Sequence, residues 1–145
     1  MSPANHSGQD SEHAIQVGIV QWWHTVGVAR YGGLPRLLAI PNGGRRDAVT
    51  GARLRAEGAL PGVPDLFLPR LCHGCGGLWL EVKTEAGRVS AAQEACLHAL
   101  HNEGYAVAVV RSVDEAVTAI DDYHRCGQLL SWDAVQQTFR PRRSR

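Results

Sequence analysis

The sequence predicts a single α/β domain in which helices cover the faces of a mixed central sheet. Its 145 residues suffice for one domain with a sizeable core, and 44% hydrophobic with 20% charged residues is ordinary for a globular protein. Segments with helical spacing of apolar residues alternate with short apolar runs that suit strands. The run Tyr105–Val110 is continuously apolar, which favours a strand covered on both faces.

Composition excludes several classes of protein. No apolar run approaches the ~20 residues of a membrane span, and no charged start followed by an apolar stretch indicates a secretory signal. Four cysteines without such a signal favour free thiols in a reducing cytoplasm. The net charge is only +1, so a nucleic-acid function must rest on local arginine clusters.

The N-terminal third predicts a helix, a short strand and a second helix. Residues 1–10 are polar and are expected to be a disordered lead, after which Ser11 caps the first helix. Its apolar residues recur at helical spacing: Ile15, Ile19, Trp22 and Val26. The following segments are expected to be a connection (Gly27–Pro35), a strand (Arg36–Ile40), a turn (Pro41–Gly44) and a short helix (Thr50–Gly58).

Two apolar runs in mid-chain predict a β-hairpin. Leu66–Leu68 and Leu78–Val82 are separated by a stretch rich in Gly and Cys. A hairpin would fold Asp65 back beside Glu81, and Lys83 would share a strand face with Glu81. Two carboxylates and one ammonium would then converge at the edge of an apolar sheet.

The C-terminal half predicts two helices around the buried strand. Ser90 and Gln93 form a capping-box pattern that opens a helix to about Glu103. Its expected apolar face consists of Ala92, Cys96, Leu97 and Leu100. Ser112 and Glu115 repeat that pattern before a helix to about Arg125. Residues 127–145 are expected to be an extension with a basic tail, either solvated or touching DNA.

The charged residues of the hairpin suit a hard divalent cation. Carboxylates on adjacent strands repel unless a cation lies between them, and carboxylate oxygens suit Mg²⁺ or Mn²⁺. The alternative is that Glu81 and Lys83 form an ordinary surface pair. Their apolar flanks count against this, as does the fact that Lys83 is the only lysine in the chain.

Four ordered motifs resemble the VRR-NUC domain of the PD-(D/E)xK, restriction-endonuclease-like superfamily. They are Ile40–Arg46, Gly-Val-Pro-Asp-Leu at 62–66, Leu-Glu-Val-Lys-Thr at 80–84, and Ser-Ala-Ala-Gln at 90–93. The similarity spans about 11–123, so residues 11–126 are expected to form the nuclease-like domain. It implies a restriction-endonuclease-like fold and Mg²⁺-dependent hydrolysis of DNA, with Mn²⁺ able to substitute.

The resemblance also implies roles for individual residues. Asp65, Glu81 and the Val82 carbonyl would ligate the metal ion, and Lys83 would orient or activate the attacking water. Glu12 would support a metal-bound water, although its position also suits a first-turn acid favoured by the helix dipole. Gln93 has two competing uses, orienting water or phosphate at the site or bonding back to the Ser90 amide.

The expected partner is duplex or branched DNA, held mainly through its phosphates. Candidate contacts are exposed basic and amide side chains near the site: Asn42, Arg45, Arg46, Arg53, Arg55 and Arg88. Short phage-like relatives imply a homodimer that cuts four-way junctions, with two sites for paired cuts. Flap cleavage, single-strand nicking and a non-catalytic DNA-binding module of the same fold remain alternatives.

The Cys72-His-Gly-Cys75 motif has two interpretations. C-x-x-C can begin a zinc knuckle, but such a site needs four ligands and no second close pair follows. The other interpretation is a hairpin tip with two free or oxidisable thiols. A zinc-stabilised adaptor protein would depend on the first.

Overall fold

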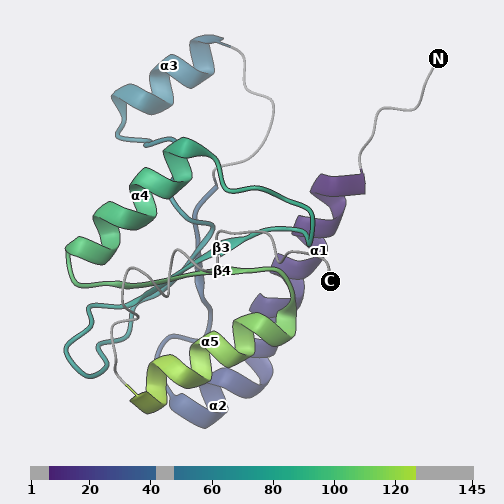
Figure 1. Cartoon of the computed structure of the whole chain (residues 1–145), viewed down its shortest axis with the longest axis vertical. Helices are drawn as coiled ribbons and strands as arrows, with labels where there is room; N and C mark the ends of the chain where they lie inside the picture. The colour runs from purple at the N-terminus through teal and green to yellow at the C-terminus, as the bar shows by residue number, and fades with distance from the viewer. Residues whose placement is uncertain (1–6, 42–47, 127–145) are drawn as a thin grey trace, which may run out of the picture.

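The computed structural model describes residues 7–41 and 48–126. Figure 1 shows a mixed α/β fold with helices on both sides of a central sheet, which confirms the predicted class. In chain order, the elements are α1 (Ser7–Trp22), the π-helix η1 (Trp23–Gly27), α2 (Val28–Tyr31), β1 (Leu38–Ala39), α3 (Ala48–Ala56), β2 (Leu66–Leu68), β3 (Leu78–Val82), α4 (Ala91–Asn102), β4 (Ala106–Val110) and α5 (Val113–Cys126).

The sheet combines antiparallel and parallel pairing. Its strand order is β1-β2-β3-β4, with β1 and β2 antiparallel, β2 and β3 antiparallel, and β3 and β4 parallel. The predicted hairpin therefore exists, and α4 makes the crossover that a parallel pair requires. Because β3 and β4 are parallel, their carboxyl ends lie side by side at the same end of the sheet.

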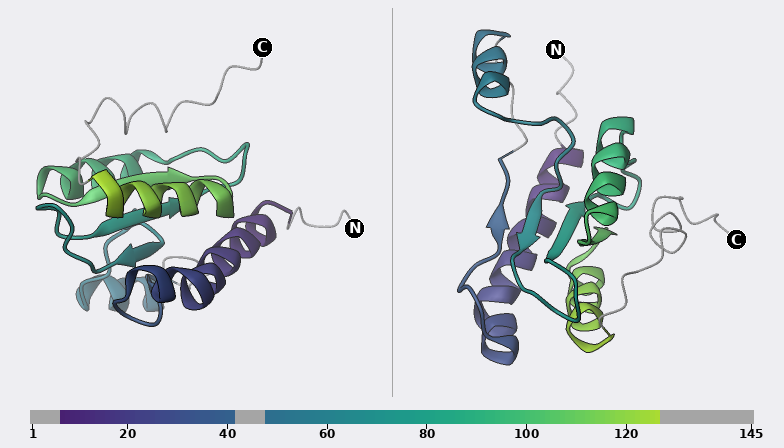
Figure 2. Two further views of the ribbon diagram at one scale, coloured as in Figure 1. Left: turned by 90° about the horizontal axis from the view of Figure 1, so that it is seen from below. Right: turned by 90° about the vertical axis from the view of Figure 1, so that its left-hand side faces the viewer.

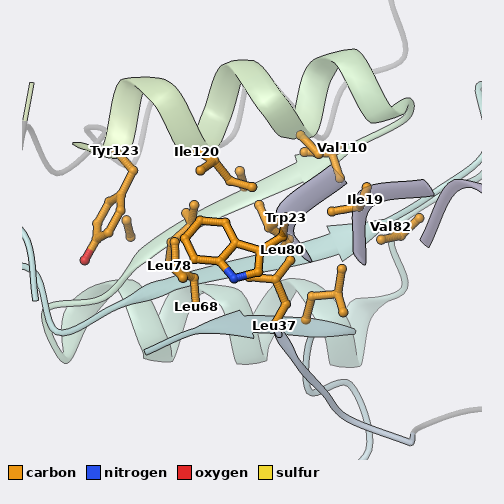
Figure 3. Close-up of a cluster of buried hydrophobic side chains, with 14 of the residues drawn as sticks. Ile19, Trp23, Leu37, Leu68, Leu78, Leu80, Val82, Val110, Ile120 and Tyr123 are labelled. Carbon is orange, nitrogen blue, oxygen red and sulfur yellow. The ribbon is translucent and has the colours of Figure 1, made fainter. Parts of the chain in front are cut away.

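Helices cover the sheet unequally on its two faces. Helices α1 and α5 pack on one face and enclose the larger core, drawn in Figure 3 around Ile19, Trp23 and Leu80. Helix α4 packs on the other face against Val107 and Val109 through Leu97. The two views of Figure 2 show these layers, with α3 standing away from the rest. Every residue of β4 is buried, as its continuous apolar run predicted.

The first helical segment is longer than predicted, and its buried face is different. Helical structure begins at Ser7 and continues through η1 and α2 to Tyr31, so the expected break at Gly27 was wrong. Trp23 is fully buried and its Nε1 donates to the Leu34 carbonyl at 2.9 Å, whereas Val26 is 38% exposed. The π-helix adds a residue to one turn and rotates the apolar stripe, which a regular helical period cannot anticipate.

Helix α4 also differs from its predicted face at one position. Leu97 is buried, and Cys96 and Leu100 are half-buried, but the Ala92 side chain is exposed. The backbone of Ala92 instead packs closely on Gly62, where a Cβ atom would lie 2.5 Å from the Ala92 carbonyl oxygen. Because Gly62 also has a φ of +89°, both its space and its backbone conformation require glycine.

Within the described ranges, no helix is both long and apolar enough to cross a membrane. Several predicted features lie outside those ranges: the first residues of the expected N-terminal lead, the candidates Asn42, Arg45 and Arg46, and the C-terminal extension with its basic tail.

Candidate active site

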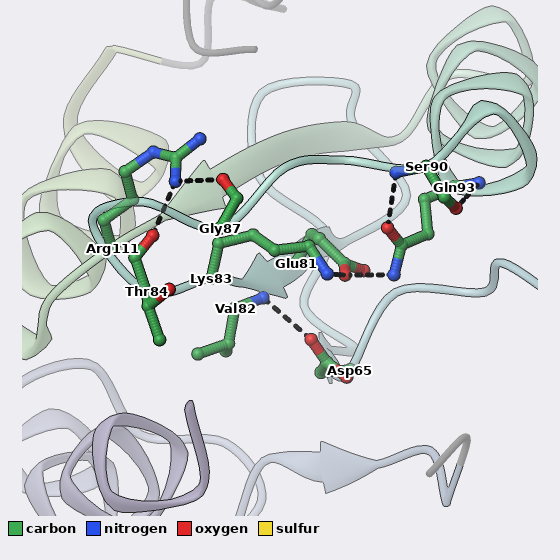
Figure 4. Close-up of polar contacts among 9 residues, drawn as sticks. All are labelled: Asp65, Glu81, Val82, Lys83, Thr84, Gly87, Ser90, Gln93 and Arg111. Atoms are coloured by element: carbon green, nitrogen blue, oxygen red, sulfur yellow. Dashed lines mark hydrogen bonds and ion pairs between the residues drawn. The ribbon is translucent and has the colours of Figure 1, made fainter. Parts of the chain in front are cut away.

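The register of the hairpin places the two predicted acids opposite each other. Leu66 pairs with Leu80 and Phe67 with Trp79, so one further step in the same register sets Asp65 against Glu81. Directly opposed residues of an antiparallel pair present their side chains on the same face. Here that face is the one covered by α4, which supplies Gln93 as a further contact to Glu81 (Figure 4).

Asp65 is fixed by the strands on both sides of it. Its Oδ2 accepts a hydrogen bond from the Val82 amide at 2.8 Å, and its backbone carbonyl accepts from the Ile40 amide at 2.9 Å. Burial raises the pKa of the Asp65 carboxyl, and the Val82 amide and the charge of Lys83 oppose that rise. Since the N–H and C=O of a strand residue point to the same side, the Val82 carbonyl also lies on the side of Asp65.

Glu81 is the most deeply buried charged residue of the described chain, with 1% of its surface exposed. Its Oε1 accepts from Lys83 Nζ at 3.0 Å and from Gln93 Nε2 at 2.7 Å. Its Oε2 is buried and has no hydrogen-bond partner within the part of the chain that the structure describes. Burial, with a smaller contribution from the Asp65 charge, raises the pKa of Glu81 to about 7, against the pull of Lys83.

Gln93 makes the capping contact that was one of its two predicted uses, and it also contacts an acid of the site. Its side-chain Oε1 accepts from the Ser90 amide at 2.8 Å, and the Ser90 hydroxyl accepts from the Gln93 amide at 3.2 Å, which completes the capping box. Its Nε2 donates to Glu81. Because an amide side chain has a donor end and an acceptor end, capping does not prevent a contact at the site, and the use of Gln93 towards water or phosphate stays a prediction. Gln93 ties the start of α4 to the acid.

Glu12 reaches the site from α1. Its charge raises the pKa of both Asp65 and Glu81, and its Oε1 lies 3.3 Å from where a Cβ atom at Gly87 would be. Among residues 7–41 and 48–126, however, no three His, Cys, Asp or Glu side chains are grouped closely enough to hold a metal ion. Direct protein ligands to a cation would thus come from the Asp65 and Glu81 pair, with Glu12 farther out.

Arg111 is a site residue that sequence reasoning missed. Its Nη1 donates to the carbonyls of Thr84 at 2.6 Å and Gly87 at 2.7 Å, holding the turn that follows Lys83 (Figure 4). Its position in the sequence could have indicated this role, because Arg111 directly follows β4 and Val110 of β4 pairs with Val82, the residue before Lys83. Arg111 therefore sits beside Lys83 at the carboxyl end of the parallel pair and positions the turn rather than touching the acids.

The donor set fits Mg²⁺ or Mn²⁺. Two carboxylates and a backbone carbonyl are hard oxygen donors, and Mg²⁺ commonly binds through one or two carboxylates together with water and phosphate oxygens. The buried Oε2 of Glu81 is an acceptor with no donor among residues 7–41 and 48–126, so a cation there would satisfy it. A cation would also favour the ionised form of both acids and so reverse the rise in their pKa values.

The predicted DNA-contacting arginines divide into two groups. Arg88 is exposed and directly follows Gly87, whose carbonyl Arg111 holds. Arg53 and Arg55 are exposed on α3, where Arg53 also pairs with Glu57 at 2.9 Å. No residue of α3 is buried, and the helix projects from the fold in the right-hand view of Figure 2.

The C-x-x-C motif forms the tip of the hairpin, as one of its two interpretations predicted. Cys72 and Cys75 pair through backbone hydrogen bonds of 2.8 and 3.2 Å across a two-residue turn. Both are free thiols, Cys75 being buried. The described residues offer them no complete set of zinc ligands.

Comparisons with known proteins agree with this geometry. Residues 10–114 match the family model described as "VRR-NUC domain". The fold is similar to a solved structure named "VRR_NUC domain protein", with a TM-score of 0.66 and 22% sequence identity, over 78% of this chain and 87% of that one. No curated protein is significantly similar in sequence.

Proposed function

The chain belongs to the VRR-NUC family of nuclease domains, and from this premise we propose that it is a Mg²⁺-dependent DNA endonuclease selective for branched DNA. One observation supports metal dependence most strongly. The Oε2 of Glu81 is buried near a second carboxylate, and none of the described residues donates a hydrogen bond to it. An ordinary surface pair of Glu81 and Lys83 would expose both side chains to water, but Glu81 is 1% and Lys83 10% exposed at the side chain.

In this proposal Asp65, Glu81 and the Val82 carbonyl hold the cation, with Glu12 supporting a water bound to it. A divalent ion at this place polarises a phosphoryl group and acidifies a neighbouring water. Gln93 keeps Glu81 in position by donating to its Oε1. The Lys83 ammonium, held at 3.0 Å from the same oxygen, orients the attacking water and stabilises negative charge as it develops on the phosphoryl oxygens.

The DNA would be held by its phosphates. Arg88, which is exposed and five residues after Lys83, would contact phosphates beside the scissile bond, while Arg53 and Arg55 on α3 would contact DNA farther away. The candidates Asn42, Arg45 and Arg46 lie outside the described residues, and their contact with DNA stays a prediction from the sequence. A two-fold dimer would supply two active sites for paired cuts across a junction.

A non-catalytic DNA-binding module of this fold is the competing class. Buried carboxylates weaken binding to phosphates. Burial raises the pKa values of both acids, and the charge of Asp65 raises that of Glu81 further. A binder has no use for that arrangement, whereas a metal-dependent enzyme requires it. Flap cleavage and nicking use the same chemistry and differ from junction cleavage only in how the DNA is held.

A cleavage assay on labelled DNA tests the proposal. We expect the protein to cut a four-way junction in Mg²⁺ or Mn²⁺ but not in EDTA, and to cut a linear duplex of the same sequence at least about tenfold more slowly, which corresponds to about 1.4 kcal/mol of discrimination. Faster cutting of a 5′ or 3′ flap would replace junction selectivity with flap selectivity. Tight binding without cutting in either metal would identify a DNA-binding module instead.

A further inference from the structure

A polar cavity lies at the end of the sheet opposite to Asp65 and Glu81. It has a volume of about 450 Å³ and opens to solvent among Arg30 and Tyr31 of α2, Arg70 after β2, and Asp121, His124 and Arg125 of α5. Helix α5 starts beside the active-site edge and runs back across the sheet, so its last turn meets α2 at the opposite end (Figure 1). None of these residues takes part in the proposed cleavage.

The cavity carries an excess of positive charge. Three guanidinium groups face one carboxylate, that of Asp121, and this carboxylate is already engaged. It accepts hydrogen bonds from the Tyr31 hydroxyl and from Arg30 Nη1, the latter at 3.3 Å. Arg125 has a loose pairing of 3.8 Å with Asp122.

Arg70 is the cation least compensated. In the described part of the chain, no carboxylate forms an ion pair with it. Its Nη1 lies 3.3 Å from where a Cβ atom at Gly33 would be. The guanidinium therefore packs over Gly33, where the absence of a side chain gives it space. Its backbone carbonyl accepts a hydrogen bond from Tyr123, which fixes the main chain independently of the side chain.

His124 forms a neutral wall of the cavity. Its ring stacks on Tyr31 with centroids 3.8 Å apart and planes 9° apart, and Nδ1 donates to the Ile120 carbonyl at 2.8 Å. Burial lowers the pKa of His124, and the charge of Arg70 acts in the same direction. The positive charge of the cavity therefore comes from its guanidinium groups. An anion that enters the cavity is expected to raise the pKa of the imidazole.

We propose that this cavity binds a phosphate group, with Arg70 as the principal donor and Arg30 and Arg125 contributing charge. A guanidinium presents a planar fork that matches two oxygens of a phosphate, and partial burial strengthens such a bond relative to open solvent. The phosphate has two possible sources, the backbone of bound DNA or a free phosphate compound. The inference does not rest on the proposed cleavage activity.

The first arm of the test uses inorganic phosphate with the full chain in EDTA. Imidazole NMR is expected to show the pKa of His124 rising as phosphate is added, because an anion favours the protonated ring, with no such rise in chloride at matched ionic strength. Arg70→Gln should weaken phosphate binding about tenfold, as loss of a charge-assisted bond does. Arg36→Gln removes an exposed arginine outside the cavity and should leave binding unchanged.

The second arm uses a DNA duplex without terminal phosphates, again in EDTA. If backbone phosphate is the ligand, the duplex raises the pKa of His124, and Arg70→Gln weakens duplex binding and lowers its salt slope by about one. If a free phosphate compound is the ligand, only the first arm responds. A His124 pKa that is the same in phosphate and in chloride, or equal phosphate affinity in Arg70→Gln and wild type, would overturn the proposal. Because no metal is present, neither result depends on cleavage.

Discussion

Asp65→Asn is expected to reduce Mg²⁺-dependent DNA cleavage by about 10³-fold or more while leaving the protein folded. The loss of one anionic ligand removes several kcal/mol of transition-state stabilisation, and each ~1.4 kcal/mol is a factor of ten in rate. Asparagine keeps an oxygen that can accept from the Val82 amide, the bond that Asp65 Oδ2 makes at 2.8 Å. Single-turnover cleavage of the junction in Mg²⁺ measures the effect.

Two comparisons make this result specific. Asp114→Asn is a matched control, because Asp114 is exposed on α5 and has no part in the site, and its cleavage rate should equal that of the wild type. Asp65→Ala should lose activity to the same extent but also lose about 1–3 kcal/mol of stability, since the Val82 amide then lacks its acceptor. Cleavage by Asp65→Asn within tenfold of the wild-type rate would show that Asp65 does not hold the ion.

Glu81→Gln is expected to remove a strong dependence of stability on pH. In the metal-free folded protein the pKa of Glu81 is raised from 4.5 to about 7, so the folded state holds this proton more tightly than the unfolded state. The contribution of Glu81 to stability is therefore greatest below about pH 4.5 and is lost as the pH rises towards 7. At ~1.36 kcal/mol per pKa unit, Glu81 accounts for a fall of about 3 kcal/mol across that window.

Urea unfolding in EDTA between pH 4 and 8, for wild type and Glu81→Gln, measures this difference. The free energy of unfolding of the variant, relative to wild type, should rise by about 3 kcal/mol over the window and stay level above it. Asp65 has a pKa shifted in the same direction, so Asp65→Asn should flatten the curve as well, by a smaller amount. Parallel curves for wild type and Glu81→Gln would contradict this prediction, because they would show that the pKa of Glu81 is the same in the folded and unfolded states.

The acid pair could be predicted from sequence because its geometry follows from local rules. Two apolar runs joined by a Gly-rich turn define a hairpin, and the register of the hairpin sets Asp65 opposite Glu81. The Ser90 and Gln93 spacing likewise defined the start of α4. What spacing could not show is that the Gln93 amide divides its two ends between Ser90 and Glu81, because that depends on how α4 is placed over the sheet.

Other features depend on contacts between distant parts of the chain. Arg111 donates to the carbonyls of Thr84 and Gly87. Because every residue has a backbone carbonyl, the sequence does not indicate which ones accept. Trp23 is buried four residues after Ile19, and the π-helix that begins there makes Gly27 the next buried residue in place of Val26, which a 3.6-residue period does not reveal. The arginine-lined cavity joins α2, the hairpin and the end of α5, so its residues become a group only in the folded molecule.

The central claim is that Asp65 and Glu81 together hold a divalent cation, and calorimetric titration with Mn²⁺ near pH 7 tests it most directly. The wild type should bind Mn²⁺ with release of a fraction of a proton, detected by repeating the titration in buffers of different ionisation enthalpy, since Glu81 is partly protonated at that pH. Asp65→Asn and Glu81→Gln should each bind at least about tenfold more weakly, and Glu81→Gln should release no proton. Wild-type affinity in both variants would contradict the claim.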